Sequence, residues 1–114
     1  MGKSLAPILD DILKAIDGAL AATQSHTAET FAADWVVRHA VQRALEIISE
    51  ASRRIPDIQA EKRPEIPWRK VRALGNLLRH EYHAIHDEVV WRITRDDLPK
   101  LRAAIVALQS DTGP

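Results

Sequence analysis

The sequence contains no cysteine, which excludes disulfide bonds and thiolate chemistry. The absence of cysteine fits a reducing compartment, and we expect a cytoplasmic protein. Long apolar runs are also missing, because Asp10, Asp11, Lys14 and Asp17 interrupt the apolar residues near the N-terminus. We therefore expect neither a signal peptide nor a contact with the membrane.

A net charge is lacking as well, since 16 basic residues offset 16 acidic ones. The protein as a whole presents no positive field to nucleic acid, so any RNA contact must come from a local patch. The Gly2-Lys3-Ser4 sequence has no earlier glycine or strand, which argues against a phosphate-binding loop. Hydrophobic residues make up 46% and charged residues 28% of the 114 positions, so we expect one globular domain over residues 1–114.

Alternating strand patterns and internal repeats are absent, and apolar residues recur at three- and four-residue spacing instead. Thr27 is a candidate cap for the second helix, and Ile55-Pro56 should end it. The spacing predicts an all-α, antiparallel four-helix bundle with a short C-terminal extension helix. The expected helices cover residues 5–20, 28–54, 67–84, 87–94 and 98–108.

Some apolar residues of the second expected helix lie off its main stripe, namely Phe31, Trp35 and Val36. Small bundles often bury such surplus surface between two copies, so we expect a homodimer. A monomer with some exposed apolar surface is the alternative. Trp35, Trp68 and Trp91 could stack on bases, but tryptophan at helical spacing is more often part of a core.

The segment LGNLLRHEYHAIHDEVVW, residues 74–91, gathers three histidines, a tyrosine and an arginine. On a helix, Arg72, Asn76, Arg79 and His83 fall within roughly 60° of one another, with His80 at the edge of this sector. The sector has four interpretations: a metal site, RNA cleavage, phosphate or nucleotide binding without chemistry, or a solvated polar face. His80, His83 and His86 stand at three-residue spacing, but no carboxylate or cysteine completes a metal-binding set with them. We therefore expect no metal and no cofactor.

Two stretches resemble the HepT family, AVQRALEIISEA at residues 40–51 and PEIPWRKVRALGNLLRHEYHAIHDEVVWRITRDDLPKLRAAI at residues 64–105. HepT proteins are HEPN-type toxins of toxin–antitoxin pairs, and their partner is a minimal nucleotidyltransferase. The resemblance implies a HEPN-like fold and a metal-independent endoribonuclease acting on RNA. The two copies of a dimer would form a composite cleft between their third helices.

The family motif is an arginine, usually a polar residue, three further positions, a histidine, any residue and a tyrosine. Asn76, His80 and Tyr82 match it, whereas Gly75 occupies the arginine position. By resemblance, His80 is the acid/base, Asn76 contacts phosphate or ribose, and Tyr82 receives AMP from the partner enzyme.

Arg79 is the expected substitute for the missing arginine, because a helical side chain reaches back over the preceding turn. Arg72 lies one turn too early. Retained cleavage and lost cleavage both remain open, and the alternative is an inactive HEPN domain that only binds its partner or a nucleotide. Arg43, Glu46 and Glu50 form a polar ridge that either orients His80 or pairs only within its own helix.

Overall fold

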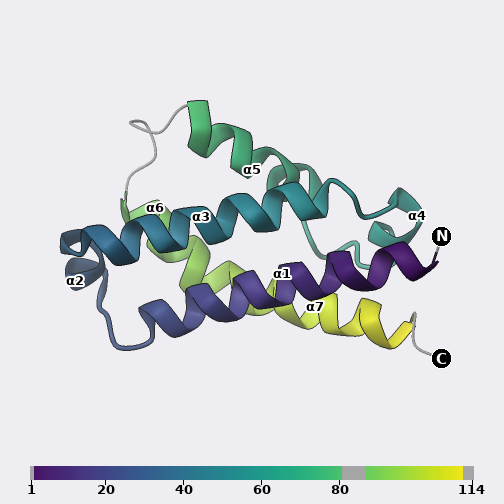
Figure 1. Cartoon of the computed structure of the whole chain (residues 1–114), viewed down its shortest axis with the longest axis horizontal. Coiled ribbons are helices and arrows are strands. Elements are labelled where there is room, and N and C mark those ends of the chain that lie inside the picture. The colour runs from purple at the N-terminus through teal and green to yellow at the C-terminus, as the bar shows by residue number, and fades with distance from the viewer. Residues whose placement is uncertain (1, 81–86, 112–114) are drawn as a thin grey trace.

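The computed structural model describes residues 2–80 and 87–111, and this part of the chain is all-α, without strands. Figure 1 shows the long helices running in alternating directions, with the start of the first helix and the end of the last helix at the same end of the molecule. None of the described helices is both long and apolar enough to cross a membrane. The elements are α1 (Gly2–Thr23), α2 (Ala28–Ala33), α3 (Trp35–Ser52), α4 (Asp57–Ala60), α5 (Trp68–His80), α6 (Asp87–Arg92), the π-helical η2 (Ile93–Asp97) and α7 (Leu98–Asp111).

The core lies between α1, α3 and α7. The apolar stripe of α1 is fully buried at Leu9, Ile12 and Ile16, and it packs against α3 and α7. Burial of such side chains contributes about 1.5–3 kcal/mol each and drives the assembly of the helices. The main partner of α5 is α3, so α5 lies at the margin of the bundle (Figure 1).

The prediction of one continuous helix over residues 28–54 is wrong, because the chain breaks at Asp34. The Asp34 backbone is extended, with φ −102° and ψ 98°, and one carboxylate oxygen accepts a hydrogen bond from the Val37 N–H at 3.0 Å. Asp34 therefore ends α2 and caps α3, a role for which aspartate is favoured. The break turns Phe31 inward, where its ring lies 5.5 Å from the Trp91 ring.

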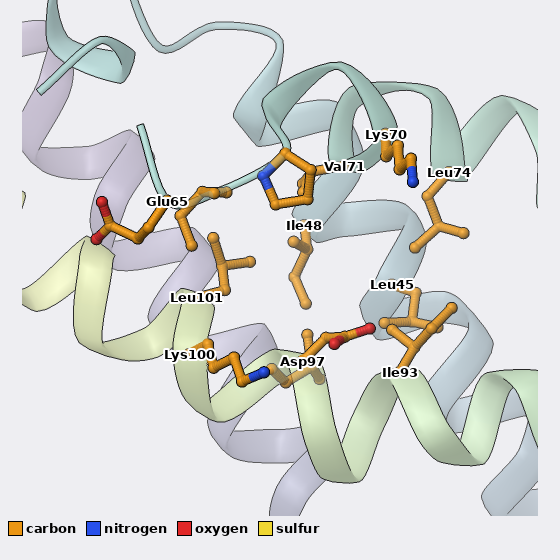
Figure 2. A pocket seen from close by; sticks show the side chains of 13 residues that line it. Leu45, Ile48, Glu65, Lys70, Val71, Leu74, Ile93, Asp97, Lys100 and Leu101 are labelled. Atoms are coloured by element: carbon orange, nitrogen blue, oxygen red, sulfur yellow. The ribbon is translucent and has the colours of Figure 1, made fainter. Parts of the chain in front are cut away.

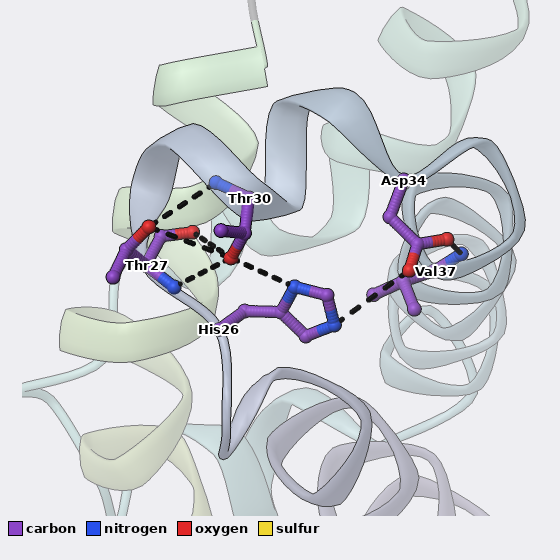
Figure 3. A network of polar contacts seen from close by, with 5 residues as sticks. All are labelled: His26, Thr27, Thr30, Asp34 and Val37. Atoms are coloured by element: carbon purple, nitrogen blue, oxygen red, sulfur yellow. Dashed lines mark hydrogen bonds and ion pairs between the residues drawn. The ribbon is translucent and has the colours of Figure 1, made fainter.

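The predicted cap at Thr27 is confirmed, and it belongs to a polar network that joins α2 to α3 (Figure 3). The Thr27 hydroxyl accepts from the Thr30 N–H at 3.1 Å, and the Thr30 hydroxyl accepts from the Thr27 N–H at 2.9 Å. His26 Nδ1 lies 3.0 Å from the Thr30 hydroxyl, and its Nε2 lies 3.7 Å from an Asp34 carboxylate oxygen. The network fixes the angle between the two helices.

The predicted break between the last two helices is also wrong. Helix α6 continues through η2 into α7, and the Leu98 N–H donates to the Ile93 carbonyl, five residues earlier. Pro99 lies within this continuous helix, next to the π-helical turn, and its missing N–H leaves one backbone hydrogen bond unformed. A further difference is the short helix α4, which lies in a segment expected to be a loop.

Candidate active site

Helix α5 carries the candidate site and is anchored at its start by Trp68. The buried Trp68 indole N–H donates to the carbonyls of Ala60 at 2.9 Å and Arg63 at 3.0 Å. Pro67 directly precedes the helix and presets its first turn. These contacts fix the N-terminal end of α5 against the segment that follows α4.

Arg72 does not belong to the free basic sector that the sequence predicts. Its guanidinium donates to the carbonyls of Ser52 at 3.1 Å and Ile55 at 3.1 Å, and it pairs with Asp57 at 3.3 Å. These carbonyls lie at and beyond the C-terminal end of α3, where backbone acceptors have no intrahelical donor. Arg72 therefore caps α3 and is not available to replace the motif arginine.

Gly75, at the motif arginine position, is buried against Ser49 of α3. Its N–H donates to the Ser49 hydroxyl at 2.8 Å, and that hydroxyl donates to the Arg72 carbonyl at 2.9 Å. A Cβ added at Gly75 would lie 3.0 Å from Ser49 Oγ and 3.1 Å from Ser49 Cβ. The arginine position of the motif thus faces α3, and a side chain there would crowd Ser49.

Asn76, Arg79 and His80 are all exposed near the C-terminal end of α5. Within the described residues, none of their three side chains forms a hydrogen bond or an ion pair. One guanidinium nitrogen of Arg79, Nη1, lies 3.5 Å from the point where a Cβ on Gly75 would stand. Arg79 thus reaches back over the glycine, as its position one turn later allows.

His83 of the predicted sector lies outside the described residues, as do Tyr82 of the family motif and His86. The metal hypothesis rested on His80, His83 and His86, so two of its three ligands fall in this segment. Over residues 2–80 and 87–111, no group of three His, Asp or Glu side chains is arranged to hold a metal ion.

The polar ridge on α3 forms an intrahelical pair, with Arg43 Nη1 3.4 Å from a Glu46 carboxylate oxygen. Glu50 is exposed.

Trp68 is buried and Trp91 partly buried, whereas Trp35 is 64% exposed and stacks on His39 with ring centroids 4.0 Å apart. Together with Val36, which is 68% exposed, Trp35 leaves an uncovered apolar patch at the start of α3.

A cavity in the described part of the chain lies elsewhere, between α3, α5, η2 and α7 (Figure 2). It encloses about 430 Å³ over an apolar floor that includes Leu45 and Ile48. Lys70, Lys100, Glu65 and Asp97 also line it, so its charges balance. Asn76, Arg79 and His80 do not line this cavity, and among the described residues they lie on an exposed face of α5.

Comparison with known proteins identifies the family of the chain. A family model described as "Ribonuclease HepT-like" matches residues 12–108. The chain is 36% identical to "Probable ribonuclease HepT" of Thermococcus cleftensis over 109 residues, which cover 96% of this chain and 99% of the relative. It is 35% identical to a Methanocaldococcus jannaschii protein named as a candidate RNase, over 90% of this chain and 94% of the relative. No solved structure shows a significant match.

The chain therefore belongs to the HepT-like ribonuclease family of the HEPN superfamily.

Sequence reasoning missed Ser49 and the capping role of Arg72. A signal for Ser49 was present, because Ser49 and Ser52 are small polar residues on the same side of α3 as Leu45 and Ile48. Small residues within an apolar stripe mark a place where another backbone approaches closely. The partner of that approach, Gly75, is 26 residues away and could not be deduced from spacing.

Proposed function

We propose that this protein is an endoribonuclease that cleaves RNA without a metal ion, as the toxin of a HepT-type toxin–antitoxin module in the cytoplasm. The observation that carries the proposal is the position of Arg79. Its guanidinium lies over Gly75, on the same helix as the exposed Asn76 and His80. A guanidinium is thus retained beside the position from which the family motif arginine is missing.

The cleavage step requires a proton acceptor, a proton donor and a positive charge. His80 takes the proton of a ribose 2′-hydroxyl, whose oxygen attacks the adjacent phosphorus. The Arg79 guanidinium neutralises the charge on the phosphorane, and Asn76 contacts its oxygens or the ribose. The bond to the 5′-oxygen breaks, and that oxygen receives a proton, which leaves a 2′,3′-cyclic phosphate. In a homodimer, His80 of the second copy can donate this proton across a composite cleft.

A cleavage assay with purified protein and single-stranded RNA tests the proposal directly. We expect cleavage to persist in chelator, and His80→Ala to abolish it because the proton-transfer group is lost. Arg79→Ala should lower the rate on the order of 10²-fold, as removal of one transition-state donor does. Arg54→Ala is the matched control, because Arg54 is exposed beyond the far end of α3. A measurable wild-type rate that Arg79→Ala leaves unchanged would refute the assigned role of Arg79.

The proposed partner is a minimal nucleotidyltransferase antitoxin that attaches AMP to Tyr82. An AMP group two residues from His80 would bring negative charge and bulk to the place where an RNA phosphate enters. Mass spectrometry after co-expression with such an enzyme should find the adduct on Tyr82. Adducts confined to other residues would count against this regulation.

The second candidate is a HEPN domain without cleavage activity that only binds its partner or a nucleotide. The buried contact between Gly75 and Ser49 favours it, because an arginine at position 75 would crowd Ser49. On this alternative, the wild-type protein is inert toward RNA and still forms a stable complex with the nucleotidyltransferase. Chromatography of the mixed proteins beside the cleavage assay distinguishes the two candidates.

A further inference from the structure

Ser49 makes an unusual contact for a serine inside a helix. Such a hydroxyl commonly bonds to a carbonyl of its own helix, one turn earlier. The Ser49 hydroxyl instead reaches the backbone of α5, where it accepts from the Gly75 N–H at 2.8 Å and donates to the Arg72 carbonyl at 2.9 Å. The side chain is only 1% exposed, so water does not readily replace these bonds.

The contact depends on both residues. A side chain at position 75 would place its Cβ 3.0 Å from Ser49 Oγ, closer than ordinary packing permits. Glycine lets the two helices approach until the hydroxyl reaches the backbone. A second hydrogen bond holds the same point, because Arg53 Nε donates to the Arg72 carbonyl at 2.9 Å. Helix α5 is thus held to α3 through its own backbone.

This attachment lies immediately before the candidate catalytic residues. Asn76 follows Gly75 directly, and Arg79 and His80 come one turn later, about 5.4 Å along the axis. Toward that end α5 diverges from α3 in Figure 1, so the Ser49 contact is a late anchor before the exposed turn. A rotation of α5 at Gly75 would therefore move all three side chains together.

We propose that Ser49 is a positioning residue of the ribonuclease site. It acts through the backbone of α5 and sets the axial position and the rotation of this helix, and therefore where Asn76, Arg79 and His80 contact RNA. It does not touch the substrate itself. This role rests on the proposed function for its effect on cleavage, whereas the anchoring of α5 can be tested without any activity.

The first test compares Ser49→Ala with Ser52→Ala. Ser52 lies almost one turn further along α3, is fully buried, and its hydroxyl has no hydrogen-bond partner among the described residues. Ser49→Ala should lower kcat about tenfold with KM within about twofold, because a loosened helix misplaces the reacting groups more than it weakens binding. Ser52→Ala should leave both constants within about twofold of the wild type. Equal losses of kcat in the two variants would show a general packing effect and overturn the proposal.

The second test measures amide hydrogen exchange at Gly75 in the same variants and needs no RNA. Loss of the acceptor should speed exchange of the Gly75 amide about tenfold in Ser49→Ala, with little change in Ser52→Ala. If the wild type does not cleave RNA, this measurement still judges the anchor, so the two failures are distinguishable. Unchanged exchange at Gly75 in Ser49→Ala would overturn the proposal, whatever the cleavage assay returns.

Discussion

Gly75 weakens its helix because it is a glycine, yet the close contact with Ser49 disfavours any larger residue at this position. A glycine within a helix costs up to about 1 kcal/mol relative to alanine, so its replacement is expected to stabilise the fold. In this structure the same glycine is buried, and an added Cβ would lie 3.0 Å from Ser49 Oγ. The effect of a substitution at this position therefore depends on the residue at position 49.

We predict that Gly75→Ala lowers the free energy of unfolding by about 1 kcal/mol, because crowding against Ser49 outweighs the gain in helix propensity. In a Ser49→Gly background, the same substitution should instead raise it by up to about 1 kcal/mol. Urea denaturation of the four proteins measures this coupling.

Gly18→Ala provides the control for helix propensity alone, since nothing lies within 4 Å of a Cβ added there. This variant should be more stable than the wild type by up to about 1 kcal/mol. If Gly75→Ala behaves like Gly18→Ala in the presence of Ser49, the crowding argument is wrong.

At the scale of the elements, apolar periodicity predicted the helices because it records which side of each one is buried. The ends of the helices depend on local capping, which apolar periodicity does not record. The chain breaks at Asp34 because its carboxylate bonds to the Val37 N–H, although the apolar pattern continues through this point. The break expected between residues 94 and 98 is absent, because the π-helical turn at Ile93–Asp97 carries the helix on into α7, although Pro99 cannot donate a backbone hydrogen bond.

The candidate site was predictable only in part. The positions of Asn76, Arg79 and His80 on one helix follow from their spacing, and all three are exposed. The functions of Arg72 and Ser49 depend on the approach of α5 to α3, which joins residues about 20 or more positions apart. Sequence spacing within one helix carries no information about such contacts.

The C-terminal end of α3 depends on Arg72, and its removal tests this cap. We predict that Arg72→Ala lowers the free energy of unfolding by about 1–2 kcal/mol, because the carbonyls of Ser52 and Ile55 lose a charged donor. Arg69→Ala, an exposed position on the same helix, should change it by less than about 0.5 kcal/mol. Urea denaturation compares the two, and equal losses would argue against the cap.

At the scale of the whole molecule, one ion pair joins the first helix to the last. The Arg102 guanidinium donates to the Asp17 carboxylate at 2.7 Å and lowers the pKa of Asp17 below its usual 3.8. The pair therefore stabilises the fold at pH values above about 4, and this contribution is lost as the pH falls through the lowered pKa.

We predict that Asp17→Asn slightly lowers the melting temperature at pH 7 and has a smaller effect at pH 2, where protonation of Asp17 weakens the pair. Both partners are about half exposed, so 1 M salt should remove most of the difference at pH 7. Thermal melts at the two pH values, with and without salt, measure the effect. An equal difference at the two pH values would count against the ion pair as its cause.

The uncovered flank of α5 leads us to predict a homodimer. Leu77 on this helix is 41% exposed, and light scattering at micromolar concentration should return twice the chain mass. Leu77→Asp should yield a monomer, and Val36→Asp, at the other exposed apolar patch, should remain a dimer. If Val36→Asp were a monomer and Leu77→Asp a dimer, the interface would lie at the start of α3. If the wild type were a monomer, the proposal of a composite cleft between two copies would be wrong.

The number of residues in the π-helical turn at Ile93–Asp97 determines which side of α7 packs against the rest of the bundle. The run of helix from α6 through α7 is uninterrupted, and its buried residues include Val90 of α6 and Leu98, Leu101 and Ile105 of α7. Each residue added to or removed from an α-helix rotates everything beyond it by about 100°. Loss of a single residue from this turn would therefore swing the buried stripe of α7 away from α1 without altering any residue of α7. The length of the segment, more than the identity of its side chains, determines how the last helix joins the first.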